Sequence, residues 1–392
     1  MKSKELWEGI YWAGAEDWDR RLFDSLIPLP DGTSYNAYLV QGREKTALVD
    51  TVDPSQFDLL REHLQSFPRV DYVIANHLEQ DHSGLIPYVL EKYPEARLLL
   101  TPTAVDLALS HLHIEEKRIK TVADGEILDL GGRTIKFIHF PWVHWPETML
   151  SYLQEERILF SCDLFGSHLT STELFLREDY LAWEPAKRYF AEIMMPFRKI
   201  IQKNLNRVED LPLAYIAPSH GPIYTRPQFI IEAYKKWIAD KPENLVVIAH
   251  VTMHGSTHKL VDRLVKALAE RNIQVQPFNL PVTDTGQLAM SLVDAATIIV
   301  ASPTVLTGLH PLAAEVVFLV NALRPKALQA GFVGSYGWKS RALEQLKAML
   351  DSVRLEFLNP VQVKGDPDQA ALKLVDNLAE EIYRKHQAAG LL

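Results

Sequence analysis

Four potential metal ligands lie close together between Val73 and Gly84, where the chain reads Val-Ile-Ala-Asn-His-Leu-Glu-Gln-Asp-His-Ser-Gly. They are His77, Glu79, Asp81 and His82. The apolar start of this stretch indicates the end of a buried strand, and the residues after Gly84 have the spacing of an amphipathic helix. In an extended backbone, residues two apart point the same way, so we expect His77, Glu79 and Asp81 to converge. Ligands just beyond the carboxyl end of a strand are typical of α/β sites, and the stretch predicts a metal site.

Three later residues repeat the pattern of a strand followed by a ligand. His144 lies just after the apolar run 134–140, Asp163 follows 158–160, and His220 follows 216–217. Taken singly, each is more typical of a core or capping residue, but the repetition favours one shared site. Four imidazoles and three carboxylates without a thiolate suit iron, manganese or zinc, and the ligand set alone does not choose among them. Seven ligands fit two metals about 3.5–4 Å apart with one bridging carboxylate.

A different kind of site is indicated by residues 251–258, Val-Thr-Met-His-Gly-Ser-Thr-His, which follow a strand and open a helix. Hydroxyl groups at Thr252, Ser256 and Thr257, with the backbone N–H groups of a helix N-terminus, form a cradle suited to a phosphate. Helix N-caps use the same residue types, so the run alone is also compatible with simple capping.

Two more loops, 301–311 and 332–338, are expected at the ends of neighbouring strands. Three such loops on one edge of a doubly wound sheet form a crevice at the switch point of the strand order. Tyr336 and Trp338 are placed to flank a flat ring, while Gly334 and Gly337 let the backbone approach it. No Gly-x-Gly-x-x-Gly follows a strand, which argues against a dinucleotide site.

The elements that must position these residues fall into two patterns. The first half mixes strand-like runs with helical periodicity, which indicates a layered α/β domain. The second half alternates regularly between short apolar strands and amphipathic helices, which predicts a doubly wound parallel sheet. A polar segment with a proline, 239–244, is a plausible linker. We expect strands at 35–40, 46–50, 97–101, 134–140, 245–250, 297–301, 328–333 and 353–358, and helices at 56–66, 104–112, 185–204, 228–239, 257–270, 311–323, 339–350 and 368–386.

Composition restricts the class of protein. A chain of 392 residues is expected to hold two or three domains. The formal charge of −9 argues against a nucleic-acid or anionic-membrane partner, and no apolar run approaches the roughly 20 residues of a membrane span. The N-terminus lacks an apolar signal core, and the single cysteine, Cys162, excludes a disulfide framework. We therefore expect a cytoplasmic protein.

The motif His-x-Glu-x-Asp-His with a later His, Asp and His resembles the metallo-β-lactamase-like domain of flavodiiron proteins, also called A-type flavoproteins. Hydrolases of that superfamily usually carry a second His where this chain has Glu79, and the oxygen ligand fits a redox diiron site better than a hydrolytic zinc site. The resemblance covers nearly the whole chain and includes Tyr35-Asn-Ala-Tyr-Leu and His144-Trp-Pro-Glu. The second half is similar to the family's flavodoxin domain, which holds flavin mononucleotide (FMN).

The resemblance implies a metallo-β-lactamase-like αββα sandwich over 1–242 and a flavodoxin-like doubly wound parallel sheet over 243–392. Carried over by position, His77, Glu79 and His144 hold one iron. Asp81, His82 and His220 hold the other, and Asp163 bridges them. The FMN contacts expected from the three loops are Thr252, Met253, His254, Gly255, Ser256, Thr257, Ser302, Pro303, Thr304, Val305, Leu306, Thr307, Gly334, Ser335, Tyr336, Gly337 and Trp338.

Three further residues are candidates for a catalytic role. Many family members carry a pocket histidine after a phenylalanine near the N-terminus, and here Phe23 is followed by Asp24. The substitution puts the usual substrate preference in doubt. His168, five residues after Asp163, is a candidate for orienting a ligand, and Tyr189 matches a tyrosine near the family's diiron pocket. A core tyrosine and a structural histidine are the alternatives.

The implied activity is reduction of dioxygen to water, of nitric oxide to nitrous oxide, or of both, with electrons passing from an external donor through FMN to a non-haem diiron centre. The donor is expected to be a separate protein or cofactor, such as rubredoxin or a reduced deazaflavin. The family also implies a head-to-tail homodimer or a dimer of dimers. Two alternatives stay open: a zinc-dependent hydrolase of the lactamase superfamily, and a non-catalytic flavin electron carrier or gas sensor.

Overall fold

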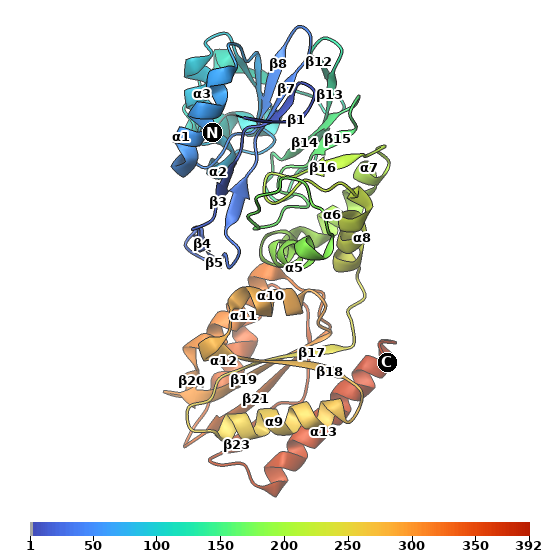
Figure 1. Ribbon diagram of the computed structural model, residues 1–392. Helices are drawn as coiled ribbons and strands as arrows, with labels where there is room; N and C mark the ends of the chain where they lie inside the picture. Colours follow the sequence, from blue (N-terminus) through green and yellow to red (C-terminus); the bar gives the residue numbers. More distant parts are fainter. Residues whose placement is uncertain (1–2) are drawn as a thin grey trace. The chain divides into compact units, whose positions relative to one another are not determined.

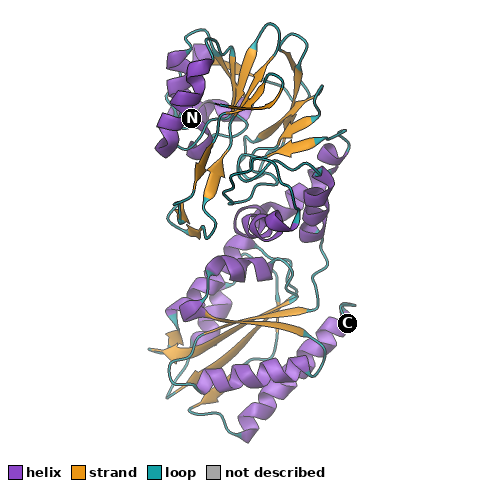
Figure 2. Cartoon of the chain, in the orientation of Figure 1, coloured by secondary structure: helices purple, strands orange, loops and turns teal. Residues whose placement is uncertain are grey.

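The computed structural model describes residues 3–392, which separate into two compact units (Figure 1). The first unit comprises Met1–Phe190 and Phe197–Lys236, and the second comprises Ala191–Pro196 and Trp237–Leu392. The domain ranges 1–242 and 243–392 stay a prediction. Both units combine sheets with helices, as expected for the predicted α/β class (Figure 2).

Two sheets form the centre of the first unit. The larger has the strand order β1-β2-β7-β8-β9-β10-β11 and the smaller the order β12-β13-β14-β15-β16. The strands of the larger sheet are β1 Lys4–Trp7, β2 Ile10–Trp12, β7 Tyr38–Gln41, β8 Thr46–Val49, β9 Tyr72–Ile74, β10 Arg97–Leu100 and β11 Ile119–Thr121. Those of the smaller sheet are β12 Ile127–Asp129, β13 Thr134–His139, β14 Met149–Leu153, β15 Ile158–Phe160 and β16 Tyr215–Ala217.

The central strands are buried on both faces, which explains their unbroken apolar sequences. One face of the larger sheet packs against the smaller sheet, where Val49 and Ile74 meet Phe137 and Phe160 in one apolar cluster. The other face is covered by helices through a second cluster. The helices of this unit are α1 Phe57–His63, α2 Gln80–Ser83, α3 Ile86–Lys92, α4 Val105–His111, α5 Tyr180–Tyr189, α6 Arg198–Asn204, α7 Asn206–Glu209 and α8 Pro227–Ile238, the last of which ends in the second unit.

Two short ribbons extend from this sandwich. β3 (Ala15–Asp17) pairs with β6 (Thr33–Tyr35), and β4 (Leu22–Phe23) pairs with β5 (Ile27–Pro28). The expected single strand over 35–40 is wrong, because β6 ends at Tyr35 and β7 begins at Tyr38. Asn36 breaks the run: its backbone N–H donates to the carbonyl of Ser219, and its side chain donates to the carbonyls of Pro218 and Gly221 at 2.9 and 2.7 Å.

The second unit is a doubly wound parallel sheet with the strand order β18-β17-β19-β21-β22. Its strands are β17 Leu245–His250, β18 Gln274–Asn279, β19 Thr297–Val305, β20 Gly308–Leu309, β21 Gln329–Tyr336, β22 Glu356–Phe357 and β23 Val361–Lys364. Its helices are α9 Ser256–Ala269, α10 Thr285–Leu292, α11 Pro311–Leu323, α12 Ala342–Met349 and α13 Gln369–Ala388. The apolar stripe of α9 packs with α13 on one face of the sheet.

The strand order places the switch point between β17 and β19, which are neighbours although β18 lies between them in sequence. Sequence periodicity missed β18 and α10. β18 is a largely exposed edge strand with polar residues and Pro277, so it has no apolar run to detect. Across residues 3–392, none of the helices combines the length and the apolar character that crossing a lipid bilayer requires.

Candidate functional site

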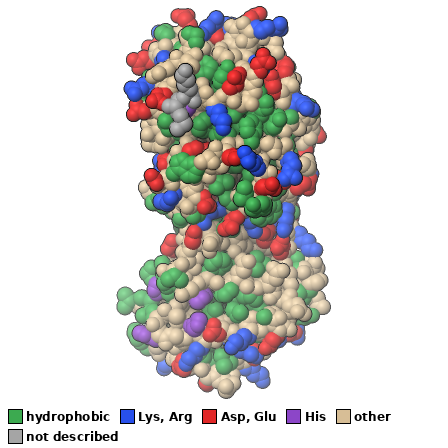
Figure 3. Space-filling model, viewed as in Figure 1, with side chains coloured by type: hydrophobic (Ala, Val, Ile, Leu, Met, Phe, Trp, Pro, Cys, Tyr) green, Lys and Arg blue, Asp and Glu red, His purple; other side chains and the backbone are tan. Residues whose placement is uncertain are grey.

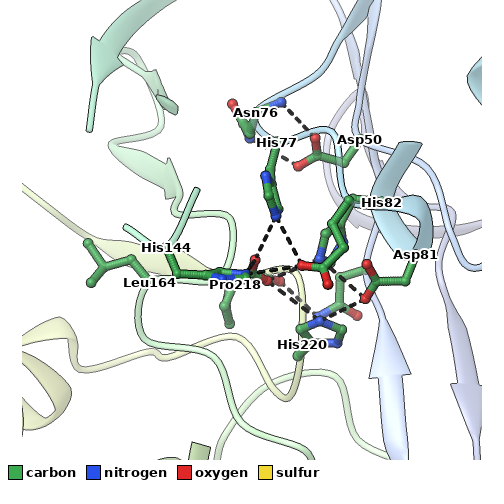
Figure 4. Close-up of polar contacts among 12 residues, drawn as sticks. Asp50, Asn76, His77, Asp81, His82, His144, Leu164, Pro218 and His220 are labelled. Carbon is green, nitrogen blue, oxygen red and sulfur yellow. Dashed lines mark hydrogen bonds and ion pairs between the residues drawn. The ribbon is translucent and has the colours of Figure 1, made fainter. Parts of the chain in front are cut away.

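All seven predicted metal ligands lie together in the first unit, at the ends of strands of both sheets. Figure 4 labels five of them, His77, Asp81, His82, His144 and His220. The stretch after β9 supplies His77, Glu79, Asp81 and His82. His144 follows β13, Asp163 follows β15 and His220 follows β16. They form two groups, and within each group the ligand atoms lie within 4.8 Å of one another. One is His77, Glu79, His144 and Asp163, and the other is Asp81, His82 and His220.

The expectation that His77, Glu79 and Asp81 converge through an extended backbone holds for His77 and Glu79, whose Nε2 and Oε2 lie 3.1 Å apart, but is wrong for Asp81. Glu79 is the N-cap of a short helix, α2, and Asp81 and His82 lie inside it. The helical turn directs Asp81 away from the first group and toward His220, with Oδ2 of Asp81 3.2 Å from Nε2 of His220. The helical turn of α2 therefore separates Asp81 and His82 from His77 and Glu79, although all four are close in sequence.

Asp163 faces both groups with different oxygens. Its Oδ2 lies 3.3 Å from Nε2 of His144 and 3.7 Å from Nε2 of His77. Its Oδ1 lies 3.1 Å from Nε2 of His82 and 3.5 Å from Nε2 of His220. Glu79 completes the first group, with Oε2 3.1 Å from Nε2 of both His77 and His144. A carboxylate with one oxygen on each side has the geometry needed to bridge two metal ions.

Most side chains of the site are removed from solvent, and Glu79 and His144 are partly exposed. His77, His82 and Asp163 are at most 1% exposed, and Asp81 and His220 are also buried. Several of the atoms that point to the centre make no hydrogen bond, including both oxygens of Asp81, Nε2 of His82 and Oδ1 of Asp163. Buried polar atoms without hydrogen bonds cost free energy unless something else binds them, and atoms aimed at a common point suit a metal ion. The donor set thus fits two metal ions.

Without metal, the imidazoles and carboxylates of the site compensate each other's charge. Burial alone lowers the pKa of His144, but hydrogen bonds to Asp163 and Glu79 and their negative charge outweigh it and raise the pKa to about 10. Burial opposes ionisation of Asp163, but the positive charge of His82 and the hydrogen bond from His144 hold its pKa well below the usual range. Metal binding must displace these protons, because metals bind neutral imidazole.

Two histidines of the site are oriented by partners that the sequence analysis did not identify. Nδ1 of His77 lies 2.8 Å from Oε1 of Glu147, which also accepts the backbone N–H of Leu78 at 3.0 Å. Nδ1 of His220 lies 2.7 Å from the carbonyl of Ser34 on β6. Such partners leave Nε2 free for a metal and fix the ring. Glu147 is the last residue of the run His144-Trp-Pro-Glu, but a carboxylate three residues from a histidine is too common to single out.

The three catalytic candidates lie at different depths. His168 is buried, with Nδ1 2.9 Å from the hydroxyl of Thr33, and its ring packs against His220 and Tyr189 at 5.0 and 4.8 Å between centroids. Burial and the positive charge of His220 keep the pKa of His168 well below its usual value, so the ring is neutral. Tyr189 is buried beside it.

Asp24 differs from the other two because it is exposed. It lies in the turn between β4 and β5 with a left-handed φ of 48°. Partial burial and the negative charges of Glu79 and Asp81 raise the pKa of its carboxyl group. The charges of the ligand cluster therefore act on this carboxyl group.

The predicted flavin loops all lie at the carboxyl edge of the second unit's sheet. Thr252–Gly255 follow β17, and Gly255 takes a left-handed φ of 90° as the N-cap of α9. Thr257 is buried, with its hydroxyl 3.0 Å from that of Ser335. The backbone N–H groups at the start of α9 are suited to a phosphate.

Parts of the other two predicted flavin loops belong to strands β19 and β21. Ser302–Val305 form the end of β19, which turns back as β20, and Gly334–Tyr336 form the end of β21. Beyond them, Leu306 is 89% exposed and Trp338 79% exposed. Figure 3 shows histidine side chains on the drawn surface of this unit, and His254 and His258 are exposed. The loops thus offer exposed apolar side chains beside a helix end that is suited to a phosphate.

Comparisons with known proteins agree with this geometry. A family model described as ODP family beta lactamase matches residues 33–221. The chain is 34% identical to the coenzyme F420H2 oxidase of Methanothermobacter marburgensis, over 97% of this chain and 99% of the relative. It is 35% identical to the nitric oxide reductase of Moorella thermoacetica, over 90% of each chain. The solved structure of rubredoxin oxygen:oxidoreductase from Desulfovibrio gigas is similar over 100% of both chains, with a TM-score of 0.92 and 28% identity.

Proposed function

This chain belongs to the flavodiiron protein family, and from that premise we propose that it is an oxidoreductase that reduces dioxygen to water, nitric oxide to nitrous oxide, or both. The main support is that all seven candidate ligands meet in a mostly buried cluster with one carboxylate facing both groups. The names of the relatives support the two gases as substrates, since they include an oxygen oxidoreductase and a nitric oxide reductase.

We assign one iron to His77, Glu79 and His144, the other to Asp81, His82 and His220, and the bridge to Asp163. When bound, the two irons supply redox equivalents and open coordination positions for a small gas, and FMN relays electrons to them. Glu79 supports iron over zinc, because a hard oxygen ligand occupies a position where hydrolytic relatives use imidazole. Glu147 and the Ser34 carbonyl hold His77 and His220 in the tautomer that binds metal.

For FMN, we assign the phosphate to Thr252–Thr257 and the ring to the loops that contain Leu306 and Trp338. The N-terminus of α9 favours an anion through its free backbone N–H groups. We also propose that a separate donor such as rubredoxin or a reduced deazaflavin supplies electrons, and that the protein acts in the cytoplasm. A head-to-tail homodimer is part of this proposal, and the high exposure of Leu306 and Trp338 supports a contact at the flavin loops.

The proposal is tested by anaerobic reduction of yellow, iron-loaded protein followed by exposure to each gas separately. We expect rapid reoxidation of the flavin, with many equivalents of at least one gas consumed while reductant lasts. A colourless protein that carries zinc would favour a hydrolase. A reduced protein that binds gas once without further consumption would favour an electron carrier or sensor.

A further inference from the structure

The hairpin of β19 and β20 contains a turn whose backbone conformation its residues do not favour. The last two residues of β19 pair with Gly308 and Leu309 of β20, which leaves Leu306 and Thr307 as a two-residue turn. Both have a left-handed φ, 47° for Leu306 and 76° for Thr307. Two-residue hairpin turns of this kind usually contain Asn-Gly, because a side chain, and above all a β-branched one, is strained at positive φ. The turn therefore needs support from outside the hairpin.

That support comes from the start of α12. Oε1 of Gln345 accepts the backbone N–H of Leu309 at 2.9 Å. A Cβ on Gly308 would lie 2.7 Å from the same oxygen and push the Gln345 side chain away, so glycine at this position permits the contact. The backbone N–H of Arg341, the N-cap of α12, donates to the carbonyl of Thr307 at 2.6 Å. The turn and the strand that follows it are thus both bonded to α12.

The same helix end also joins this hairpin to the third predicted flavin loop. The hydroxyl of Thr304, on β19, donates to the hydroxyl oxygen of Ser340 at 2.8 Å. Ser340 follows Trp338 by two residues, and its hydroxyl oxygen also accepts the N–H of Ala342 at the start of α12 at 3.2 Å. The hairpin that carries Leu306 and the loop that carries Trp338 are therefore fixed to one helix end.

The side chain that this strained turn presents is apolar and lies in solvent, since Leu306 is 89% exposed. An exposed leucine adds no burial to the core of the second unit, so packing within the unit does not offset the strain. Strained backbone that persists because neighbouring structure holds it is typical of ligand clamps. A flat ligand that covers Leu306 would remove its apolar surface from water and so offset the strain.

We propose that Gln345 is a positioning residue for FMN: its side chain holds the strained turn of Leu306 and Thr307 in the form that contacts the flavin ring, so that this part of the site is ordered before FMN binds. A loop that is already ordered loses little conformational freedom on binding, which increases affinity. Gln345 acts through Leu306 and does not itself contact the ring. The inference rests on the proposed function, because it takes the FMN ring as the ligand of this turn.

The inference is tested with three glutamine variants of the full chain, each titrated with FMN after its flavin has been removed. Gln345→Leu removes the acceptor at similar size, and the FMN dissociation constant should rise about tenfold because the turn must then be ordered during binding. Gln345→Glu keeps an oxygen that accepts the Leu309 N–H, so its affinity should stay close to that of the wild type. Gln387→Leu, at an exposed position near the end of α13, is the matched control and should leave the affinity unchanged. Quenching of FMN fluorescence measures each affinity.

A second readout depends neither on FMN nor on turnover. In hydrogen–deuterium exchange of the flavin-free protein, peptides that cover 304–309 should exchange faster in Gln345→Leu than in wild type, while peptides that cover β17 should not change. The inference is overturned if Gln345→Leu binds FMN as tightly as wild type, or if Gln345→Glu is weakened as much as Gln345→Leu. It is also overturned if exchange over 304–309 is unaltered or rises equally throughout the second unit. If the wild-type protein binds no FMN, the proposed flavin site fails, whereas exchange still decides whether Gln345 holds the turn.

Discussion

The predicted sites of the two units consist of different kinds of residue. In the first unit, seven ionisable side chains are gathered into a mostly buried cluster, and the carboxylates and imidazoles shift each other's pKa values. In the second unit, the predicted flavin contacts are mostly small hydroxyl, glycine and exposed apolar residues at a strand edge. A metal site depends on ionisable side chains that must lose protons to bind the ion, whereas a phosphate site needs mainly free backbone N–H groups.

The largest expected effect comes from removing the negative charge of Asp163, which faces both groups of ligands. Asp163→Asn should lose iron and lower turnover by at least about 100-fold, since loss of even a ligand's hydrogen-bond partner costs 10–100-fold. The yellow flavin should remain, because the second unit does not depend on this carboxylate. Iron content, flavin absorbance and turnover are measured on the same sample. Retention of both irons would remove Asp163 from the bridging position, and loss of both cofactors would mean that the chain unfolds.

The reciprocal experiment disrupts only the flavin site. Ser256→Glu places a carboxylate in the first turn of α9, where it stabilises the helix by about 0.3–1 kcal/mol but repels a phosphate. We expect the FMN dissociation constant to rise about 100-fold, equivalent to about 2.7 kcal/mol, with iron content unchanged. Thr285→Glu, at the start of α10, is the matched control and should leave FMN affinity unaltered. Equal FMN affinity in wild type and Ser256→Glu would move the phosphate away from α9.

A smaller effect is expected from the carboxylate that holds His77. Glu147→Gln keeps the shape of the side chain but removes the charge that favours the metal-binding tautomer of the imidazole. Iron affinity should fall about 10–100-fold, with FMN binding intact. Competition with a chelator measures the affinity, and the exposed Glu115→Gln serves as control. Unchanged iron affinity would show that the backbone alone orients His77.

The smallest effect concerns the pH dependence of stability. A histidine pKa is raised in the first unit and lowered in the second. Carboxylates raise the pKa of His144 to about 10, but burial lowers the pKa of His386 on α13 from 6.5 to about 4. The neutral His386 ring bonds the Thr297 hydroxyl at 2.9 Å and the Asn244 side chain at 2.8 Å. The unfolded chain binds the proton more readily, so this contribution is present above pH 6.5 and lost as pH falls toward 4.

Acidification from pH 7.5 to 5 should therefore lower stability by roughly 1–2 kcal/mol through His386 alone. His386→Gln should reduce that loss. The melting temperatures of wild type and variant are compared at both pH values, with the metal state held constant. Identical pH dependence in the two proteins would mean that His386 gains no proton on unfolding.

The sequence predicted that seven candidate ligands cluster, but it did not predict how they are arranged. The identity of the seven was readable because each follows a strand and carries a metal-binding side chain, but the division of Asp81 from Glu79 depends on the helical turn of α2, which four residues are too short to signal. Glu147 and the Ser34 carbonyl were not predictable, since their role depends on contacts between distant strands. In the second unit, the regular alternation of apolar strands and amphipathic helices predicted the parallel sheet. The exposed edge strand β18 has no apolar run and was therefore not predicted.

The central claim is that two iron ions are bound by these seven side chains, and diffraction from crystals of iron-loaded protein on both sides of the iron absorption edge tests it most directly. We predict two anomalous peaks about 3.5–4 Å apart, one among His77, Glu79 and His144 and the other among Asp81, His82 and His220, with Asp163 contacting both. A single peak, or a peak that appears only at the zinc edge, would contradict the account.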